Sequence, residues 1–203
     1  NEITGDMRVC GTMASLAGLE QALLLKDDVL TEMAVARIRM LYGVLCSIGG
    51  IPLIFMGEEW GVLNDYGYSS DPEKVDDSRW VHRPEMDWKL LQQKKRKNSV
   101  RKKLFEMMKQ VIHLRQEAEA LCGNHMKLLE VHNSQVLVFL RWHDSNLLWV
   151  VANFSEKPQT ISLQQLRTQG YAHFLKDAFT QYEFSTMEPF ELAPYELLWL
   201  QED

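Results

Sequence analysis

The chain has 203 residues, of which 46% are hydrophobic and 25% are charged, and its formal net charge is −6. This composition is that of a folded protein able to bury a real core, and the length allows one or two domains. The acidic balance supplies no long-range attraction to nucleic acid or to an anionic membrane, and it permits a neutral ligand such as a sugar.

The cysteines and the first residues of the chain give indications of the cellular compartment. Cys10, Cys46 and Cys122 are odd in number and far apart, and none forms a CxxC pair. This argues against a disulfide framework or a zinc site and favours a reducing compartment, so we expect a cytoplasmic protein. No apolar run approaches the roughly 20 residues of a membrane span, and no basic and apolar leader opens the chain. Because the first residue is Asn1 rather than Met, we expect a fragment, and secretion of the whole protein stays open.

The first half of the chain reads as helical up to one short apolar run. Residues 11–25 carry small and apolar side chains at helical spacing, and Thr12 or Ser15 can cap the start. A second helix is predicted to stop at Gly49 and Gly50. The run IPLIFMG at 51–57 is bounded by glycines, which is typical of a strand buried on both faces of a parallel sheet. A helix followed by a buried strand indicates a βα architecture.

A long aperiodic segment follows, from Trp60 to about Gln92. Loops of this length in compact domains are usually functional or disordered, and the aromatic residues of this one argue against disorder. After it, a helix is predicted over residues 99–121, with Asn98 or Ser99 as its cap. The basic residues just before that helix suit its solvated start better than a nucleic-acid patch.

The pattern of residues in the last third of the chain is typical of a β domain. Five stretches rich in β-branched and aromatic residues are separated by turn residues, at 125–132, 135–143, 146–155, 158–164 and 190–201. We predict at least five strands in a small antiparallel sandwich or barrel, with a domain boundary near residues 122–124.

Two groups of charged residues are candidates for chemistry. Glu58 and Glu59 follow the predicted strand, where ligand-binding loops begin, although such carboxylates more often cap backbone N–H groups. Arg79 stands between Asp77 and Trp80. A guanidinium pairs with a carboxylate and still offers donors to hydroxyls, and tryptophan stacks on pyranose rings, so a sugar pocket is one interpretation. A surface ion pair beside a packed aromatic is the other, and the spacing leaves both open.

No nucleophile triad, metal-ligand pattern or phosphate loop appears in the sequence, so we predict no metal site and no cofactor.

Four stretches resemble one enzyme family. They are TGDMRVCGTMASLAGLEQAL at 4–23, RIRMLYGVLCSIGGIPLIFMGEE at 37–59, LND at 63–65 and DDSRWVHRPEMDW at 76–88. They are similar to the carboxyl-terminal part of amylosucrase and its sucrose-hydrolase relatives, in glycoside hydrolase family 13 of the α-amylase superfamily. The resemblance continues more weakly through VVANFSEKPQTI and YELLWL. The superfamily usually has Gly-Asp-Glu where this chain has Gly-Glu-Glu at 57–59.

The resemblance implies an α/β plus all-β fold. Residues 1–122 would be the last βα elements of a (β/α)8 TIM barrel, with the last strand at about 51–57 and the last helix at about 99–121. Residues 123–203 would be the antiparallel β-sandwich called domain C.

The resemblance also implies roles for five residues. Arg79 would face the glucosyl pocket and pair with an acidic residue at its floor, and Arg8 would reach toward the fructosyl site. Asp76, Asp77 and Trp80 would shape the loop that carries Arg79.

Family 13 enzymes are retaining, and their nucleophile, acid/base and stabilising carboxylates fall on positions before Asn1. No residue of this chain is therefore assigned a catalytic role, and we predict that the isolated chain is inactive. The complete enzyme would take sucrose and α-glucan as substrates, with no nucleic-acid or membrane partner. Whether it hydrolyses sucrose or builds a polymer stays open. We also expect the chain alone to self-associate, since a partial barrel exposes apolar surface.

Two alternatives remain. The chain is the same part of another superfamily enzyme, such as a trehalose synthase or an α-glucosidase, or it is a noncatalytic carbohydrate-binding module built on residues 124–203.

Overall fold

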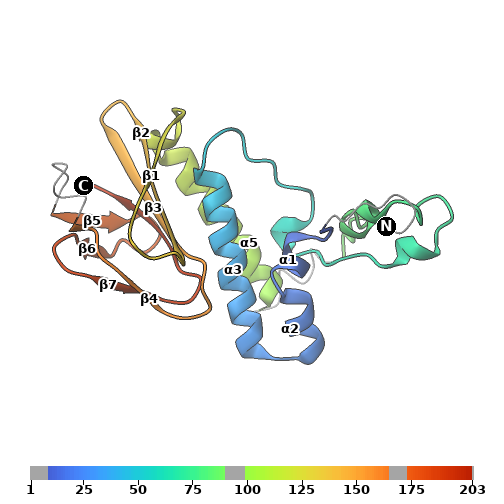
Figure 1. Cartoon of the computed structure of the whole chain (residues 1–203). Coiled ribbons are helices and arrows are strands. Elements are labelled where there is room, and N and C mark those ends of the chain that lie inside the picture. The colour runs from blue at the N-terminus through green and yellow to red at the C-terminus, as the bar shows by residue number, and fades with distance from the viewer. Residues whose placement is uncertain (1–8, 90–98, 165–172, 203) are drawn as a thin grey trace. The chain divides into compact units, whose positions relative to one another are not determined.

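The computed structural model describes residues 9–89, 99–164 and 173–202. The chain divides into two compact units: the first takes in the chain up to residue 38 and residues 54–106, and the second residues 39–53 and 107–203. The division falls within the two longest helices, α3 (Asp28–Ser47) and α5 (Val100–Glu117), which are labelled in Figure 1.

The first unit begins with two short helices where the sequence predicts one. α1 (Met13–Leu16) and α2 (Leu19–Leu25) are separated at Gly18, whose φ of 92° cannot continue a right-handed helix. The Thr12 hydroxyl accepts a hydrogen bond from the Ser15 backbone N–H at 3.2 Å, so the predicted cap is confirmed. Arg37 donates to the carbonyl oxygen of Ala17 at 2.6 Å, which satisfies a backbone group exposed by the break.

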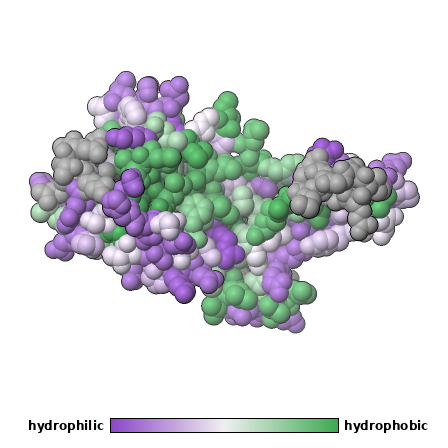
Figure 2. All heavy atoms as spheres, in the orientation of Figure 1, coloured by the Kyte–Doolittle hydropathy of each residue, from purple (hydrophilic) through white to green (hydrophobic). Residues whose placement is uncertain are grey.

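One face of α2 and the start of α3 is apolar and exposed. Leu24 and Val29 are 79% and 71% exposed, and Figure 2 shows hydrophobic side chains gathered over α2. This face is not buried by the described residues.

The aperiodic segment is held by three single-turn 3-10 helices, η1 (Glu58–Trp60), η2 (Gly67–Ser70) and η3 (Ser78–His82). The start of this segment packs against α5. The rings of Trp60 and Phe105 stack with centroids 4.2 Å apart, and Arg101 donates a hydrogen bond to the Trp60 carbonyl oxygen at 3.0 Å. The segment is thus neither a long helix nor a strand, as its lack of periodicity predicts.

The strand predicted at 51–57 is not formed in the structure. Ile51 and Leu53, whose side chains the prediction buried, are 88% and 86% exposed. A strand needs a neighbour to receive its backbone hydrogen bonds, and every strand of the described residues begins at His125 or later. The apolar run therefore has no sheet to join.

The helix predicted at 99–121 is confirmed as α5 followed by η4 (Glu119–Leu121). The Ser99 hydroxyl accepts from the Lys102 backbone N–H at 3.2 Å, which identifies Ser99 as a cap, while Asn98 lies outside the described residues. Leu104, Met108 and Val111 are buried along one stripe of the helix.

The second unit contains two antiparallel sheets (Figure 1). The larger has the order β1-β2-β3-β8-β5-β6, and its strands are β1 (His125–Leu129), β2 (Val136–His143), β3 (Asn146–Asn153), β8 (Leu197–Gln201), β5 (Phe174–Asp177) and β6 (Glu183–Ser185). The smaller pairs β4 (Gln159–Ile161) with β7 (Phe190–Leu192). Between them lies a core that includes Val138, Leu140, Trp149, Val151 and Leu198.

The predicted antiparallel β structure is confirmed, with differences in detail. β2 and β3 form a hairpin in which His143 pairs with Asn146, so the turn contains two residues. The stretch at 190–201 is two strands, since Pro194 and Tyr195, whose φ is 54°, interrupt it. The short strands β5 and β6 were not predicted.

The central strands of the large sheet are buried on both faces. On the face away from the small sheet, Gly43 of α3 packs so closely on Leu197 that an added Cβ would lie 1.9 Å from a Leu197 methyl carbon. Arg141 is fully buried there and donates to the carbonyl oxygens of Ser47 at 2.8 Å and of His125 at 3.0 Å. Helical residues before 123 thus belong to the same compact unit as the strands.

All three cysteines are free thiols, and burial raises the pKa of the Cys46 thiol.

Candidate functional site

The candidate site is the loop at residues 71–83, which ends in the short helix η3. Asp77 is the N-cap of η3, with an extended backbone, and its Oδ1 accepts a hydrogen bond from the Arg79 backbone N–H at 3.0 Å. Asp is among the preferred capping residues because its short side chain reaches these N–H groups. The cap fixes where the helical turn begins.

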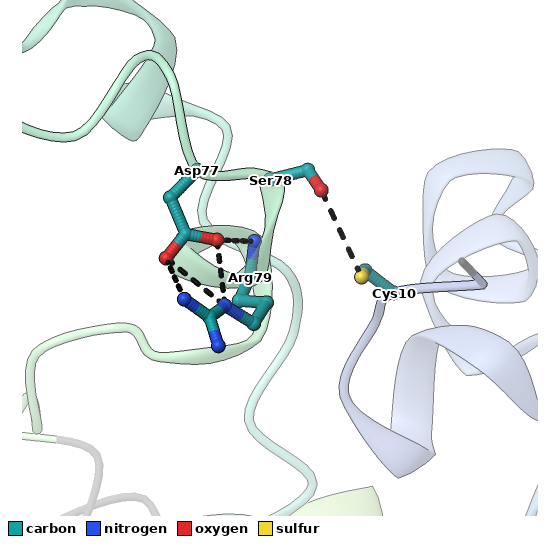
Figure 3. A network of polar contacts seen from close by, with 4 residues as sticks. All are labelled: Cys10, Asp77, Ser78 and Arg79. Carbon is teal, nitrogen blue, oxygen red and sulfur yellow. Dashed lines mark hydrogen bonds and ion pairs between the residues drawn. The ribbon is translucent and has the colours of Figure 1, made fainter. Parts of the chain in front are cut away.

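The same carboxylate also binds the side chain of Arg79. Arg79 Nε lies 2.8 Å from Asp77 Oδ1 and 3.0 Å from Oδ2, and Arg79 Nη2 lies 2.7 Å from Oδ2. Figure 3 shows the guanidinium and the carboxylate facing each other edge to edge. This is the bidentate arrangement for which arginine is suited.

The pair changes the acidity of Asp77. Hydrogen bonds from the Arg79 side chain, and then from the Arg79 backbone N–H, lower the pKa of the Asp77 carboxyl to about 2. The Asp77 carboxyl therefore takes up a proton only at more acidic pH than an ordinary aspartate does.

Trp80 is engaged by cations of the protein. Lys74 Nζ lies 5.2 Å and Arg83 Cζ 5.6 Å from the centroid of its ring, both within the range of cation–π contacts. Lys74 in turn pairs with Asp71 at 3.2 Å. Hydrogen bonding from the Glu73 backbone, and then from Lys74, lowers the pKa of Asp71.

Contacts within the first unit hold this loop in place. The carbonyl oxygen of the buried residue Val81 accepts from the Asp65 backbone N–H at 2.8 Å. Asn64 joins the LND stretch to α1, since its Oδ1 accepts from Thr12 N–H at 2.8 Å. Cys10 Sγ lies 3.9 Å from Ser78 Oγ, as drawn in Figure 3.

Glu58 and Glu59 act as backbone caps. Glu59 Oε2 accepts from the Gly57 N–H at 2.8 Å, and Glu58 Oε1 accepts from the Met13 N–H at 3.4 Å. The capping interpretation is confirmed for both carboxylates.

Three of the five predicted binding residues, Asp77, Arg79 and Trp80, therefore belong to one cluster, with Asp76 exposed beside them. Arg8 lies outside the described residues. The sequence analysis missed the contact of Lys74 with Trp80, although the i,i+3 spacing of Lys74 from Asp71 was a weak signal. Arg83 had the same two interpretations as Arg79 from the sequence, and the structure places it beside Trp80.

Within residues 9–89, 99–164 and 173–202, no group of three acidic, histidine or cysteine side chains is arranged to hold a metal ion. Nor does that part of the chain contain a helix with the length and apolar character needed to cross a membrane.

Comparison with known proteins shows similarity to amylases, both in a family match and in the fold. Residues 126–199 match the family described as Maltogenic Amylase, C-terminal domain. The structure is similar to a variant of AmyP in complex with maltotriose, with 18% identity, a TM-score of 0.66, and coverage of 86% of this chain and 35% of AmyP. It is also similar to the maltogenic amylase of S. marinus, with 17% identity, a TM-score of 0.54, and coverage of 82% of this chain and 19% of that protein.

A variant of MutB in complex with sucrose shares the fold too, with 17% identity, a TM-score of 0.57, and coverage of 82% of this chain and 38% of MutB. MutB is a trehalulose synthase. The chain thus spans no more than about two fifths of the similar structures, and its β domain resembles the C-terminal domain of glycoside hydrolase family 13 enzymes.

Proposed function

We propose that the chain is the C-terminal part of an enzyme of the α-amylase superfamily, and that the complete enzyme moves the glucosyl unit of sucrose to water or to an α-glucan. The observation that carries this proposal is the extent of the fold similarity. The family match at 126–199 is well under half of the chain, whereas the AmyP likeness covers 86% of it. The likeness therefore also takes in residues before the β domain.

Residues 1–122 are proposed to be the end of a (β/α)8 barrel, followed by domain C at 123–203. In the second unit, Arg39 of α3 and Gln110 of α5 both contact Phe179, while Arg115 of α5 donates to the carbonyl oxygen of Cys46. The two helices therefore run in the same direction. Neighbouring parallel helices joined by a long connection are what successive βα units produce.

The run at 51–57 also fits this proposal. It is apolar, bounded by glycines and unpaired, with Ile51 and Leu53 largely exposed. A barrel strand separated from its neighbouring strands would have these properties. Its neighbours would come from parts of the enzyme outside this chain.

Sucrose as the substrate rests on the loop of Arg79. The DDSRW stretch resembles the sucrose-acting branch, and in the structure it presents Arg79 in a fixed pair with Asp77. Arg79 and Arg8 would bind substrate, and Asp76, Asp77 and Trp80 would shape the loop. The catalytic carboxylates would lie outside the chain, so the 203-residue piece alone would be inactive.

A second candidate is an enzyme that acts on maltose or short α-glucans. The family match is to a maltogenic amylase domain, and AmyP was crystallised with maltose and with maltotriose. The two candidates differ in their products, because sucrose releases fructose and an α-glucan does not.

The test compares the longest protein encoded by the gene with the 203-residue chain, each given sucrose, maltotriose and trehalose in turn. Fructose release by the longer protein alone supports the sucrose-acting enzyme. Turnover of maltotriose without fructose release from sucrose favours the second candidate. Glucan binding by the 203-residue chain, with no turnover by any longer form, would instead make it a binding module and refute the proposal.

A further inference from the structure

We propose that the exposed apolar face of the hairpin formed by α2 and the start of α3 is an interface between two copies of this chain, related by a two-fold axis. This surface, the hairpin face, consists of Leu23, Leu24, Leu25, Val29 and Leu30. The inference goes beyond the proposed function, because it concerns assembly and requires no particular substrate. It also assigns self-association to one surface, although the run at 51–57 is a second exposed apolar surface of the chain.

The helix α2 is apolar on two sides. Leu19 and Ala22 are buried on one side, while Leu24 and Leu25 are exposed on another. A helix at a protein surface usually has one apolar stripe and turns its polar residues toward water. α2 instead turns leucines outward, where Figure 2 shows hydrophobic side chains gathered together. Exposed apolar patches of this kind mark sites where another surface binds.

Hydrogen bonds at the turn between the two helices hold the hairpin face in one form. Lys26 ends α2 with a φ of 55°, and the Asp27 N–H donates to the Ala22 carbonyl oxygen at 3.1 Å. The Asp27 carboxylate then accepts from the Leu30 N–H at 3.0 Å, at the start of α3. A surface that is already ordered loses little conformational entropy when it binds.

The size of the hairpin face suits a weak dimer. Its five aliphatic side chains are 38% to 79% exposed. A fully exposed leucine or valine side chain offers roughly 60–120 Å², so the five together offer roughly 150–350 Å². A stable interface buries about 800 Å² per partner and surrounds its apolar centre with a polar rim. Two copies of this face therefore supply the apolar centre of a small interface, and we expect a Kd of about 1–100 µM.

Charged residues of both signs border the hairpin face. Lys26 and Asp28 lie on either side of Asp27, both are exposed, and neither forms an ion pair with another residue that the structure describes. A two-fold axis brings residue i of one copy to residue j of the other and j to i, so each Lys26 can meet Asp28 of the partner subunit. A rim of a single sign would repel its own copy. The mixed signs therefore favour a second copy of this chain over a strongly charged partner.

The experiment measures the masses of the 203-residue chain and of the longest protein encoded by the gene, by sedimentation at several concentrations. Both are expected to form dimers and nothing larger, because an isologous contact uses the same surface on both copies. Leu24→Glu should raise the Kd of the dimer at least about 10-fold, since it buries a charge in each half of the contact. Its urea unfolding should match that of the wild type, because Leu24 is an exposed position.

Leu53→Glu is the matched control. It makes the same substitution at a side chain that is 86% exposed in the run at 51–57, outside the hairpin face. The Kd of this variant should stay within about twofold of the wild-type value. If Leu53→Glu raises the Kd and Leu24→Glu does not, the contact lies on the run at 51–57 and the inference is overturned.

An exchange of charges tests the two-fold arrangement. Lys26→Glu alone brings acidic side chains together at the rim, and Asp28→Lys alone brings basic ones together, so each should raise the Kd by about 2- to 10-fold. The double variant has opposite charges again, and its Kd should return to within about twofold of the wild-type value. Increases that multiply in the double variant would contradict the two-fold contact.

Two further results would overturn the inference. One is a monomeric 203-residue chain at all concentrations up to about 1 mM, ten times the weakest expected Kd. The other is a longer protein that stays monomeric while the 203-residue chain dimerises, because another part of that protein would then cover the hairpin face. A dimeric longer protein that turns over neither sucrose nor α-glucans would overturn the proposed function and support this inference.

Discussion

Removing the buried arginine of the β domain is expected to destabilise the second unit. Arg141 has no exposed surface and donates to the carbonyl oxygens of Ser47, His125 and Gly123. Arg141→Leu keeps an apolar stem of similar length and leaves three carbonyl oxygens without this donor. The change therefore tests the hydrogen bonds more than the packing.

The magnitude follows from the number of acceptors. Each buried acceptor that loses its partner costs about 1–3 kcal/mol, and solvent or backbone adjustment recovers part of this. With three acceptors affected, the total loss should be about 3–5 kcal/mol, the range of large single-substitution effects that come from breaking buried hydrogen-bond networks. With a urea m-value of about 2–3 kcal/mol per M, the midpoint of unfolding should fall by about 1–2 M.

The assay is urea unfolding of the 203-residue chain followed by tryptophan fluorescence, because Trp149 and Trp199 are fully buried in the same unit. Lys127→Leu is the control, since Lys127 is exposed on the neighbouring strand β1 and its loss should change the free energy of unfolding by less than about 0.5 kcal/mol. If the urea midpoint of Arg141→Leu lies within experimental error of the wild-type midpoint, the hydrogen bonds of Arg141 do not stabilise the fold and the reasoning is refuted.

Three further predictions concern packing, titration and association. Gly43→Ala should lower the free energy of unfolding by about 1–3 kcal/mol in the same urea assay, since its Cβ would meet Leu197 at 1.9 Å; a stability equal to wild type would contradict the close approach. The Asp77 carboxyl should titrate at about 2 by NMR, and Arg79→Ala should return its pKa toward the ordinary value. Because folding lowers this pKa, any contribution of the pair to stability is present above the unfolded-state pKa and is lost as the pH falls toward 2; an unshifted titration in Arg79→Ala would refute the pairing. Finally, the isolated chain should self-associate in sedimentation experiments, because Leu24 and Val29 expose 79% and 71% of their surface; a monodisperse monomer at high concentration would count against this.

The sequence was most informative where local pattern and tertiary environment agree. The β-branched and aromatic residues and the turn residues of 135–155 predicted β2 and β3, because a two-residue turn and two apolar faces leave few other options. β5 and β6 were missed because strands of three or four residues carry too few positions to show a period. The break at Gly18 was missed for a related reason, since a single glycine inside a helical pattern is usually tolerated.

At the candidate site, the spacing left a surface ion pair of Arg79 with a neighbouring carboxylate as one of two interpretations, and the structure shows that pair with Asp77. Asp77 is two residues away, near enough for pairing, yet spacing alone does not show that the carboxylate holds both the backbone N–H and the guanidinium. The contacts of Lys74 and Arg83 with Trp80 arise from how the loop folds back on itself, which no periodic pattern records.

The run at 51–57 shows why burial cannot be taken from apolarity alone. Its composition predicts a strand covered on both faces, and in the structure Ile51 and Leu53 are instead largely exposed. A buried parallel strand depends on two neighbouring strands and two covering layers, none of which it can specify by itself. Whether such an apolar run forms a buried strand therefore depends on the neighbouring segments as well as on its own residues. The same reasoning applies to the exposed face of α2, which is also apolar and is not buried by the described residues.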